Sequence, residues 1–126
     1  MKIINEDEVL GDIYTGEYAR SIKHLCAPWN FDTKYIWLGV IKYSPNASSN
    51  KHSHDEQEEV FYCISGNGYI VVDQEKRILK SGTAVYVPPK SLHQIINDTN
   101  NELIVLSAVS PPFEIDQYKK DHNFQG

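Results

Sequence analysis

The chain has 126 residues, 40% of them hydrophobic, and this length fits one domain with a single hydrophobic core. Its 17 acidic residues outnumber its 12 basic ones, and the net charge of −5 argues against nucleic acid or an anionic membrane surface as the main partner. We therefore expect one domain over residues 1–126, with no nucleic acid and no membrane among its partners.

The N-terminal segment MKIINEDEVLGD has no apolar stretch after Lys2, so we expect no secretory signal. No segment of the chain approaches the length of an apolar membrane-spanning helix. These features predict a cytoplasmic protein in which Cys26 and Cys63 are reduced thiols. A disulfide between the two cysteines is the less favoured alternative.

The first 34 residues give the weakest structural signal. Residues 17–25, EYARSIKHL, allow either a strand or a short helix, and we favour a strand. His24, like His122 near the C-terminus, lies outside any recognisable motif. We expect both histidines at the surface and assign them no role.

From residue 35 onward the chain consists of short runs rich in Val, Ile, Tyr and Phe, each closed by Gly, Pro, Asn or Ser. Such runs are typical of an antiparallel sandwich or barrel, and several are apolar on both faces, which favours strands buried between two sheets. Residues 65–68, SGNG, predict a hairpin turn. After Pro112 the polar tail predicts one or two helical turns. The strands are expected at residues 35–43, 59–64, 69–73, 77–80, 84–89, 93–97 and 102–109.

His52 and His54 raise the question of a metal site. Side chains alternate along an extended strand, so two histidines one residue apart point the same way and can both reach one cation. A solvated polar loop is the alternative, since such pairs also occur by chance. The acidic residues that follow favour the metal site.

Glu59 is the last acidic residue before the apolar run VFYCI. It lies five residues after His54, which would place the two on opposite faces of a straight strand, but a turn within residues 55–58 removes that objection. If Glu59 opens the next strand, its carboxylate can face the same cavity as Phe61 and Cys63. We expect the neighbouring Glu56 and Glu58 to be solvated.

His93 follows a proline-stiffened turn and opens the expected strand 93–97. It shares one face of that strand with Ile95 and Asn97 by the same alternation. A lone histidine at this place would more often be a surface residue. Its position after a rigid turn, however, suits a meeting with the first histidine pair.

Residues 46–66 resemble the first motif of the cupin family, written G-x5-H-x-H-x(3,4)-E-x6-G. The matching positions are His52, His54, Glu59 and Gly66.

Residues 82–97 resemble the second cupin motif, G-x5-P-x-G-x2-H-x3-N. Here the matches are Gly82, Pro88, His93 and Asn97, so that eight anchors in all occur in the right order.

Two positions depart from the cupin pattern. Asn46 stands at the first glycine of the first motif, and Lys90 stands at the glycine of P-x-G. Asn accepts a positive φ better than most residues, so the first change is mild. Lys accepts it poorly, so we expect the turn after Pro88 to differ in shape.

The resemblance implies a small all-β fold, a jelly-roll-like antiparallel β-barrel with little helix. It implies that His52, His54, Glu59 and His93 bind one divalent ion inside the mouth of the barrel. Three imidazoles and one carboxylate suit Fe, Mn, Co, Ni or Zn, and four protein ligands leave two positions open on an octahedral ion. The resemblance also implies a homodimer that pairs through sheet edges and the N-terminal strands within residues 1–34.

Cupins include isomerases, epimerases, decarboxylases, lyases and dioxygenases, and the fold does not choose among them. We favour metal-assisted isomerase, lyase or decarboxylase chemistry on a small hydroxy, keto or sugar-acid compound, with Glu59 or a tyrosine of the pocket as base. A metal-dependent dioxygenase is one alternative. A non-catalytic barrel that binds or senses a small ligand is the other.

The remaining chemistry-bearing residues receive structural interpretations. Cys63 is expected to point into the barrel as a small hydrophobic residue. Arg20 and Lys42 lie in expected strands; either can neutralise an anionic substrate, but a solvated or dimer-edge position is favoured. The aromatic residues of the strands are expected in the core or the pocket wall. These are Tyr35, Trp37, Tyr43, Tyr62 and Tyr86.

Overall fold

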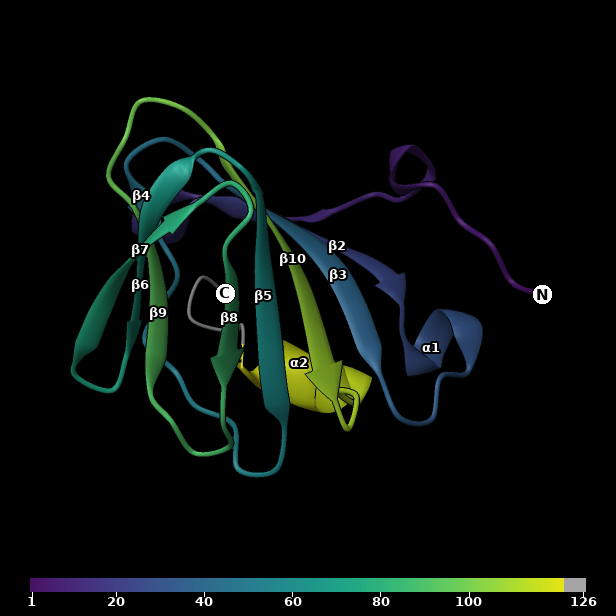
Figure 1. Cartoon of the computed structure of the whole chain (residues 1–126). Helices are drawn as coiled ribbons and strands as arrows, with labels where there is room; N and C mark the ends of the chain where they lie inside the picture. Colours follow the sequence, from purple (N-terminus) through teal and green to yellow (C-terminus); the bar gives the residue numbers. More distant parts are fainter. Residues whose placement is uncertain (122–126) are drawn as a thin grey trace.

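The computed structural model of the protein describes residues 1–121, and two antiparallel sheets dominate it (Figure 1). The first sheet runs in the order β1 (Asp12–Tyr14), β2 (Arg20–Cys26), β3 (Trp37–Tyr43), β10 (Leu103–Ser110), β5 (Glu58–Ser65) and β8 (Ala84–Val87). The second runs in the order β4 (Ala47–Ser48), β9 (His93–Asn97), β6 (Asn67–Val72) and β7 (Glu75–Lys80). The expected all-β, jelly-roll-like fold is confirmed.

Helical structure is sparse in the described chain, as expected. Two 3₁₀ turns, η1 (Glu6–Glu8) and η2 (Gly16–Tyr18), flank β1, and a short α1 (Pro28–Phe31) joins β2 to β3. The polar tail forms α2 (Ile115–Asp121), in agreement with the predicted helical turns, and His122 lies outside the described residues. None of the helices within residues 1–121 has the length and hydrophobicity that crossing a bilayer requires.

The strands from residue 35 onward begin and end close to their predicted positions. Residues 93–97 form β9 as predicted, and the strand favoured for residues 17–25 is β2, which begins only at Arg20 because Gly16–Tyr18 form η2. The two shortest strands, β1 and β4, were not predicted. A run of two or three residues has too little alternation to be read from a sequence, and pairing with longer neighbours produces these strands.

Residues 65–68 do not form the predicted hairpin turn. Strand β5 belongs to the first sheet and β6 to the second, so the chain passes between sheets at Gly66. Gly66 has a φ of 91°, and a Cβ there would lie 2.5 Å from the carbonyl oxygen of Glu102. The glycine serves a close backbone crossing, which local sequence does not distinguish from a hairpin.

The hydrophobic core lies between the two sheets, and β5 shows how it is built. Phe61 and Cys63 point inward and are buried, while Val60, Tyr62 and Ile64 point outward and are 40–46% exposed. The expectation that Cys63 faces the interior is confirmed, and both cysteines are free thiols. The expectation of burial on both faces is wrong for β5, since no other layer of the described chain covers its outer side.

The aromatic residues divide in the same way. Trp37 and Tyr43 are 2% exposed and belong to the core, as predicted. Tyr35, Tyr62 and Tyr86 are 78%, 44% and 54% exposed, so the prediction of core or pocket wall is wrong for them. Tyr62 and Tyr86 are on outward positions of β5 and β8, and Tyr35 precedes β3.

Candidate metal centre

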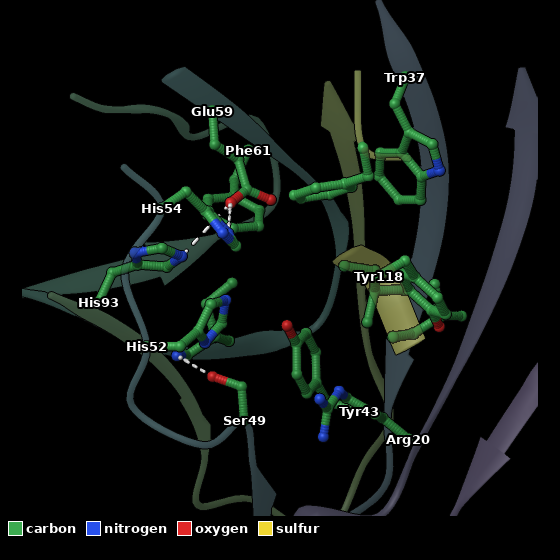
Figure 2. A pocket seen from close by; sticks show the side chains of 14 residues that line it. Arg20, Trp37, Tyr43, Ser49, His52, His54, Glu59, Phe61, His93 and Tyr118 are labelled. Carbon is green, nitrogen blue, oxygen red and sulfur yellow. Dashed lines mark hydrogen bonds and ion pairs between the residues drawn. The ribbon is translucent and has the colours of Figure 1, made fainter. Parts of the chain in front are cut away.

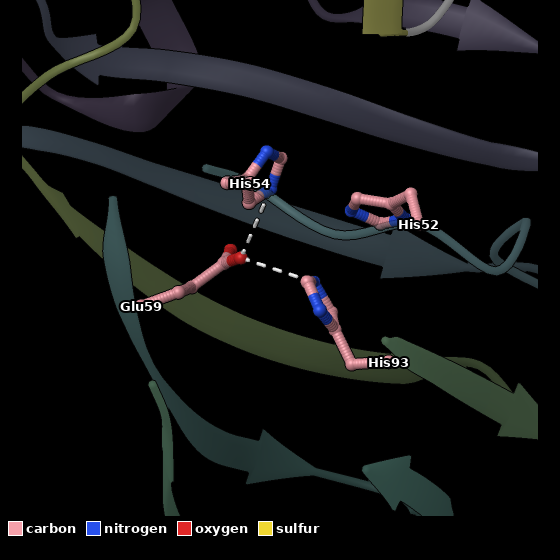
Figure 3. A group of neighbouring side chains, drawn as sticks. All are labelled: His52, His54, Glu59 and His93. Carbon is pink, nitrogen blue, oxygen red and sulfur yellow. Dashed lines mark ion pairs between the residues drawn. The ribbon is translucent and has the colours of Figure 1, made fainter. Parts of the chain in front are cut away.

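Backbone pairing brings the candidate ligands of both motifs together. His52 and His93 form an isolated antiparallel bridge, in which the N–H of each donates to the carbonyl of the other at 3.1 and 2.9 Å. His54 follows two residues later, and Glu59 projects inward from β5 (Figure 3). The turn expected within residues 55–58 lies between His54 and β5, so the odd spacing of His54 and Glu59 is no obstacle.

The four side chains converge on one point. Glu59 Oε1 lies 3.3 Å from His93 Nε2 and 3.6 Å from His54 Nε2. One ligand atom from each of His52, His54, Glu59 and His93 lies within 4.8 Å of the other three. Of the four residues, only His52 is more than slightly exposed.

Hydrogen bonds orient these ligand atoms. Nδ1 of His52 lies 2.9 Å from the carbonyl oxygen of Asn50, and Nδ1 of His93 lies 3.1 Å from that of Ser91. A carbonyl only accepts, so each Nδ1 carries the proton, and a neutral ring then presents its Nε2 lone pair. The hydroxyl of Ser107 donates to Glu59 Oε2 at 2.6 Å.

Ser107 is a supporting residue that the sequence did not reveal. It is fully buried on β10, at an inward position between Val105 and Val109. The available signal was a hydroxyl at an inward position of an otherwise apolar strand. Its partner Glu59 became evident only from the pairing of β10 with β5, in which Ser107 and Glu59 lie two positions apart.

The electrostatics of the cluster favour a cation. Burial, together with His93, lowers the pKa of His52 to about 3, so this ring is neutral at pH 7. Burial alone would raise the pKa of Glu59, but His54 and His93 outweigh it and hold the carboxyl ionised. Burial alone would lower the pKa of His93, but the Glu59 carboxylate outweighs it and the pKa is raised.

The geometry fits a first-row transition ion. Two ligands bonded to one such ion at about 2.1 Å lie no more than about 4.2 Å apart. The 4.8 Å limit observed here exceeds that by about 0.6 Å, so the ligand side chains would have to move slightly closer together to bind one ion. Oε1 of Glu59 and Nε2 of His93 are moreover buried without a hydrogen bond, which a shared cation would remedy.

The cluster lies in the wall of an interior cavity between the sheets (Figure 2). The space inside it that is open to a water-sized sphere is about 30 Å³, which is room for about one water molecule. Arg20 and Tyr43 approach it from the side across from Glu59 and His93. The favoured surface or dimer-edge position for Arg20 is therefore wrong, since this residue is 3% exposed and lines the cavity.

The two departures from the motif glycines keep the glycine-like backbone. Asn46 has a φ of 57°, and Lys90 has a φ of 70°. The premise that Lys90 would avoid a positive φ is thus wrong. The N–H of Lys90 donates to the carbonyl of His54 at 2.7 Å, and this contact compensates a left-handed conformation that costs a lysine about 1–2 kcal/mol.

A second group of polar side chains lies around His24, and we call Asp12, His24, Trp37 and Tyr118 the outer cluster. Trp37 Nε1–H donates to His24 Nδ1 at 3.1 Å, and His24 Nε2 lies 2.9 Å from Asp12 Oδ2. Tyr118 donates to the same Asp12 oxygen at 3.0 Å. The side chain of His24 is only 12% exposed, so the expected surface position is wrong.

Comparison with known proteins agrees with this architecture. The sequence profile of the family described as "Cupin domain" matches residues 39–109. A solved structure with a TM-score of 0.77 is a predicted oxalate decarboxylase from Thermotoga maritima, at 18% identity over 86% of this chain and 98% of that one.

Two curated relatives are similar in sequence. An uncharacterized protein of Methanocaldococcus jannaschii is 39% identical over 62 residues, which are 49% of this chain and 50% of that protein. A glucose-6-phosphate isomerase of Thermococcus gammatolerans is 28% identical over 116 residues, which are 87% of this chain and 59% of that protein. The chain thus spans half to three-fifths of the length of these two relatives.

Proposed function

The chain belongs to the cupin family, and from that premise we propose that it is a metal-dependent enzyme. In this proposal His52, His54, Glu59 and His93 bind one divalent ion of iron, manganese, nickel, cobalt or zinc. The observation that carries the proposal is the convergence of their four ligand atoms within 4.8 Å in the wall of a cavity.

The proposed reaction is of the isomerase, lyase or decarboxylase type, on a small hydroxy, keto or sugar-acid compound. A bound divalent ion supplies a Lewis acid for a carbonyl oxygen of such a compound. Support comes from the relative named glucose-6-phosphate isomerase and from the structural neighbour named as a predicted oxalate decarboxylase.

Two cavity residues have distinct proposed roles. Glu59 is the proposed catalytic carboxylate and acts by holding the ion, because its low pKa makes it a weak base. Tyr43 is the proposed hydrogen-bond donor to a substrate oxygen, because burial raises the pKa of its hydroxyl and keeps it protonated. The side chain of Tyr43 reaches into the cavity opposite the ion ligands (Figure 2).

The test begins with protein purified without a metal-affinity tag. Elemental analysis is expected to find about one transition ion per chain, and the His52→Ala/His93→Ala double variant is expected to lose it. Loaded protein is then incubated with small hydroxy, keto and sugar acids, and conversion is followed by NMR. A wild-type protein that cannot be loaded contradicts the proposal.

A dioxygenase is the second candidate, because three imidazoles and one carboxylate also suit Fe(II). Oxygen uptake by the iron-loaded protein with the same compounds separates the two. Uptake that matches substrate consumption would favour the dioxygenase. Conversion without uptake would favour the isomerase, lyase or decarboxylase.

We also propose a homodimer in which the N-terminal segment contacts a second copy. Within this segment Ile3, Leu10 and Ile13 are 84%, 95% and 71% exposed, and β1 is an edge strand. Exposed apolar side chains beside an open strand edge favour pairing with another chain. Light scattering during gel filtration is expected to give twice 14.4 kDa, and a mass of 14.4 kDa would contradict the dimer.

A further inference from the structure

The cavity beside the candidate ion site is closed in this structure. It has room for about one water molecule, and all of its lining residues except His52 are buried. Sites that take up small molecules typically measure about 300–1,000 Å³. Part of the cavity wall must therefore move before a substrate can reach the ion ligands.

Backbone pairing fixes most of this wall. The majority of the lining residues lie on β2, β3, β5 and β9, which are paired within the two sheets. The loop that carries Ser49, His52 and His54 bonds to the backbone of β9. The two remaining lining residues, Phe113 and Tyr118, come after the last strand. The segment that contains them is thus the part of the wall that can move without breaking a sheet.

Tyr118 separates the cavity from an open groove at the surface, which we call the outer groove. About 560 Å³ of this groove is open to a water-sized sphere, and its lining includes Asp12, Tyr14, Trp29 and Ile115. Among the described residues, Tyr118 alone lines both spaces. Figure 2 shows it across the cavity from the ion ligands. Displacement of its ring would join the two spaces and make room for a small molecule.

The hydroxyl of Tyr118 makes two hydrogen bonds that water can replace. It donates to Asp12 Oδ2 at 3.0 Å and, with its one proton used there, accepts from the hydroxyl of Tyr14 at 3.2 Å. The side chain of Asp12 is 49% exposed, and both partners line the outer groove. Exchange of such bonds for bonds to water has a small net cost, so these contacts suit a reversible latch.

The helix that carries Tyr118 has few buried side chains. Of the α2 side chains that the structure describes, only that of Tyr118 is buried. Phe113, just before the helix, is a second buried anchor, with its ring centre 5.0 Å from that of His54 and 5.5 Å from that of Trp37. An element with so little buried surface opens locally at a lower cost than a strand inside a sheet.

We propose that Tyr118 is a gate between the outer groove and the candidate ion site. In the closed state its ring and that of Phe113 keep other molecules away from the ion ligands. Local opening of α2 moves the Tyr118 ring out of the wall and joins the groove to the cavity. The identity of what passes the gate, a small hydroxy, keto or sugar-acid compound, rests on the proposed function.

The chemical accessibility of His93 in metal-free protein measures gate opening. His93 is 2% exposed and directs Nε2 at Glu59 in the cavity wall, so diethyl pyrocarbonate must pass an opening in that wall to reach it. The reagent is added for short times to protein stripped by a chelator. Mass spectrometry then gives the rate at which His93 is labelled.

Three variants that each lose one tyrosine hydroxyl are compared with wild-type protein. Tyr118→Phe removes both latch bonds and is expected to speed the labelling of His93 roughly 5- to 50-fold. Tyr14→Phe removes one of them, and roughly a 2- to 10-fold increase is expected. Tyr86→Phe is the matched control, because it removes a 3.2 Å bond to Glu58 and lines neither space. It is expected to label at the wild-type rate.

Hydrogen exchange on β9 separates gate opening from a general loss of stability. The N–H of Ile95 donates to Ser49 Oγ at 2.9 Å, and its exchange rate is expected to stay at the wild-type value, because the open gate leaves β9 paired. Labelling of His93 that is unchanged in both gate variants, or that rises only in step with Ile95 exchange, overturns the gate. Where Tyr118→Phe does not fold, Tyr14→Phe decides.

A zinc-loaded arm distinguishes failure of the gate from failure of the proposed function. Zinc is expected to pass to a chromogenic chelator faster from Tyr118→Phe than from wild-type protein, with equal equilibrium affinity because Tyr118 is not among the ligands. Faster labelling of His93 in protein that cannot be loaded supports the gate and contradicts the proposed function. Normal zinc binding with unchanged labelling overturns the gate and leaves the proposed function standing.

Discussion

The two histidine clusters of this protein use similar side chains in different ways. In the outer cluster donors meet acceptors: Trp37 donates to His24, and Asp12 Oδ2 accepts from Tyr118 and contacts His24 Nε2. In the candidate ion site, Glu59 Oε1 and His93 Nε2 lie 3.3 Å apart, so two groups that offer electron pairs face each other whenever the His93 ring is neutral. Complementary partners stabilise a fold, whereas converging acceptors require a cation.

The Trp37 contact makes this difference concrete. An indole N–H can only donate, so His24 Nδ1 must accept, and Nε2 carries the proton directed at Asp12. Both nitrogens of His24 are therefore engaged within the protein. His93 uses only Nδ1 in this way, toward Ser91, and directs Nε2 at Glu59. Whether both ring nitrogens are engaged by protein partners is thus the criterion that separates the two clusters.

The largest expected effect on metal affinity comes from removing one histidine from each cluster in turn. His93→Ala is expected to lower metal affinity by more than the roughly 10- to 100-fold cost of losing an outer partner of a ligand. His24→Ala is expected to leave metal affinity unchanged. Competition with a chromogenic chelator measures both variants against wild-type protein. Equal losses of metal affinity in the two variants would show that the two clusters do not differ in metal binding.

The next effect concerns Ser107, which supports Glu59 from behind. Ser107→Ala removes the 2.6 Å hydrogen bond to Glu59 Oε2 and is expected to lower metal affinity roughly 10- to 100-fold. Ser110→Ala is the matched control on the same strand, because it removes a 2.6 Å bond to the carbonyl of Tyr35. The same chelator competition applies. Unchanged affinity in Ser107→Ala would show that Glu59 needs no such support.

The pH dependence of metal affinity reports on His93. The pKa of His93 is raised by Glu59, so below that pKa an ion must displace a proton from this ring. Affinity is expected to fall about tenfold per pH unit there and to level off above it. His52 adds no proton competition between pH 7 and pH 4, because its pKa is about 3. Affinity that rises on acidification would contradict this assignment.

The smallest effect is expected in the outer cluster. Asp12→Asn weakens the contacts with His24 and Tyr118 and is expected to lower the free energy of unfolding by about 1 kcal/mol. Metal affinity is expected to stay unchanged. Asp32→Asn, at an exposed carboxylate 3.6 Å from Lys2, serves as the control with almost no effect. Denaturant unfolding of metal-free protein measures both variants, and a loss of metal affinity in Asp12→Asn would contradict a purely structural role.

Local pattern was enough for the long strands and for the candidate ligands. Residues 93–97 alternate strictly between inward and outward positions, and the structure forms β9 over those residues. The resemblance to the two cupin motifs implied the ligand set His52, His54, Glu59 and His93, and the structure brings these residues together. Strand alternation depends on nearest neighbours along one strand, and a sequence displays it directly.

The sequence-based predictions were wrong for residues that contact segments far away in the chain. Residues 65–68 have the composition of a hairpin turn, but Gly66 is required by the approach of Glu102. Lys90 has poor intrinsic tolerance of a positive φ, yet a hydrogen bond to His54 holds it there. Tyr86 and Arg20 show the same limit, because burial depends on which layer covers each face of a sheet.

By itself, the sequence determined an all-β chain with two ligand motifs and little helix, since alternation, turn residues and motif spacing are local properties. Only the tertiary structure decided that Arg20 faces the cavity, that Ser107 supports Glu59 and that His24 belongs to a closed hydrogen-bond network. Each of these depends on strands far apart in the chain lying side by side. The free energy that selects such pairings belongs to the whole folded core rather than to any one segment.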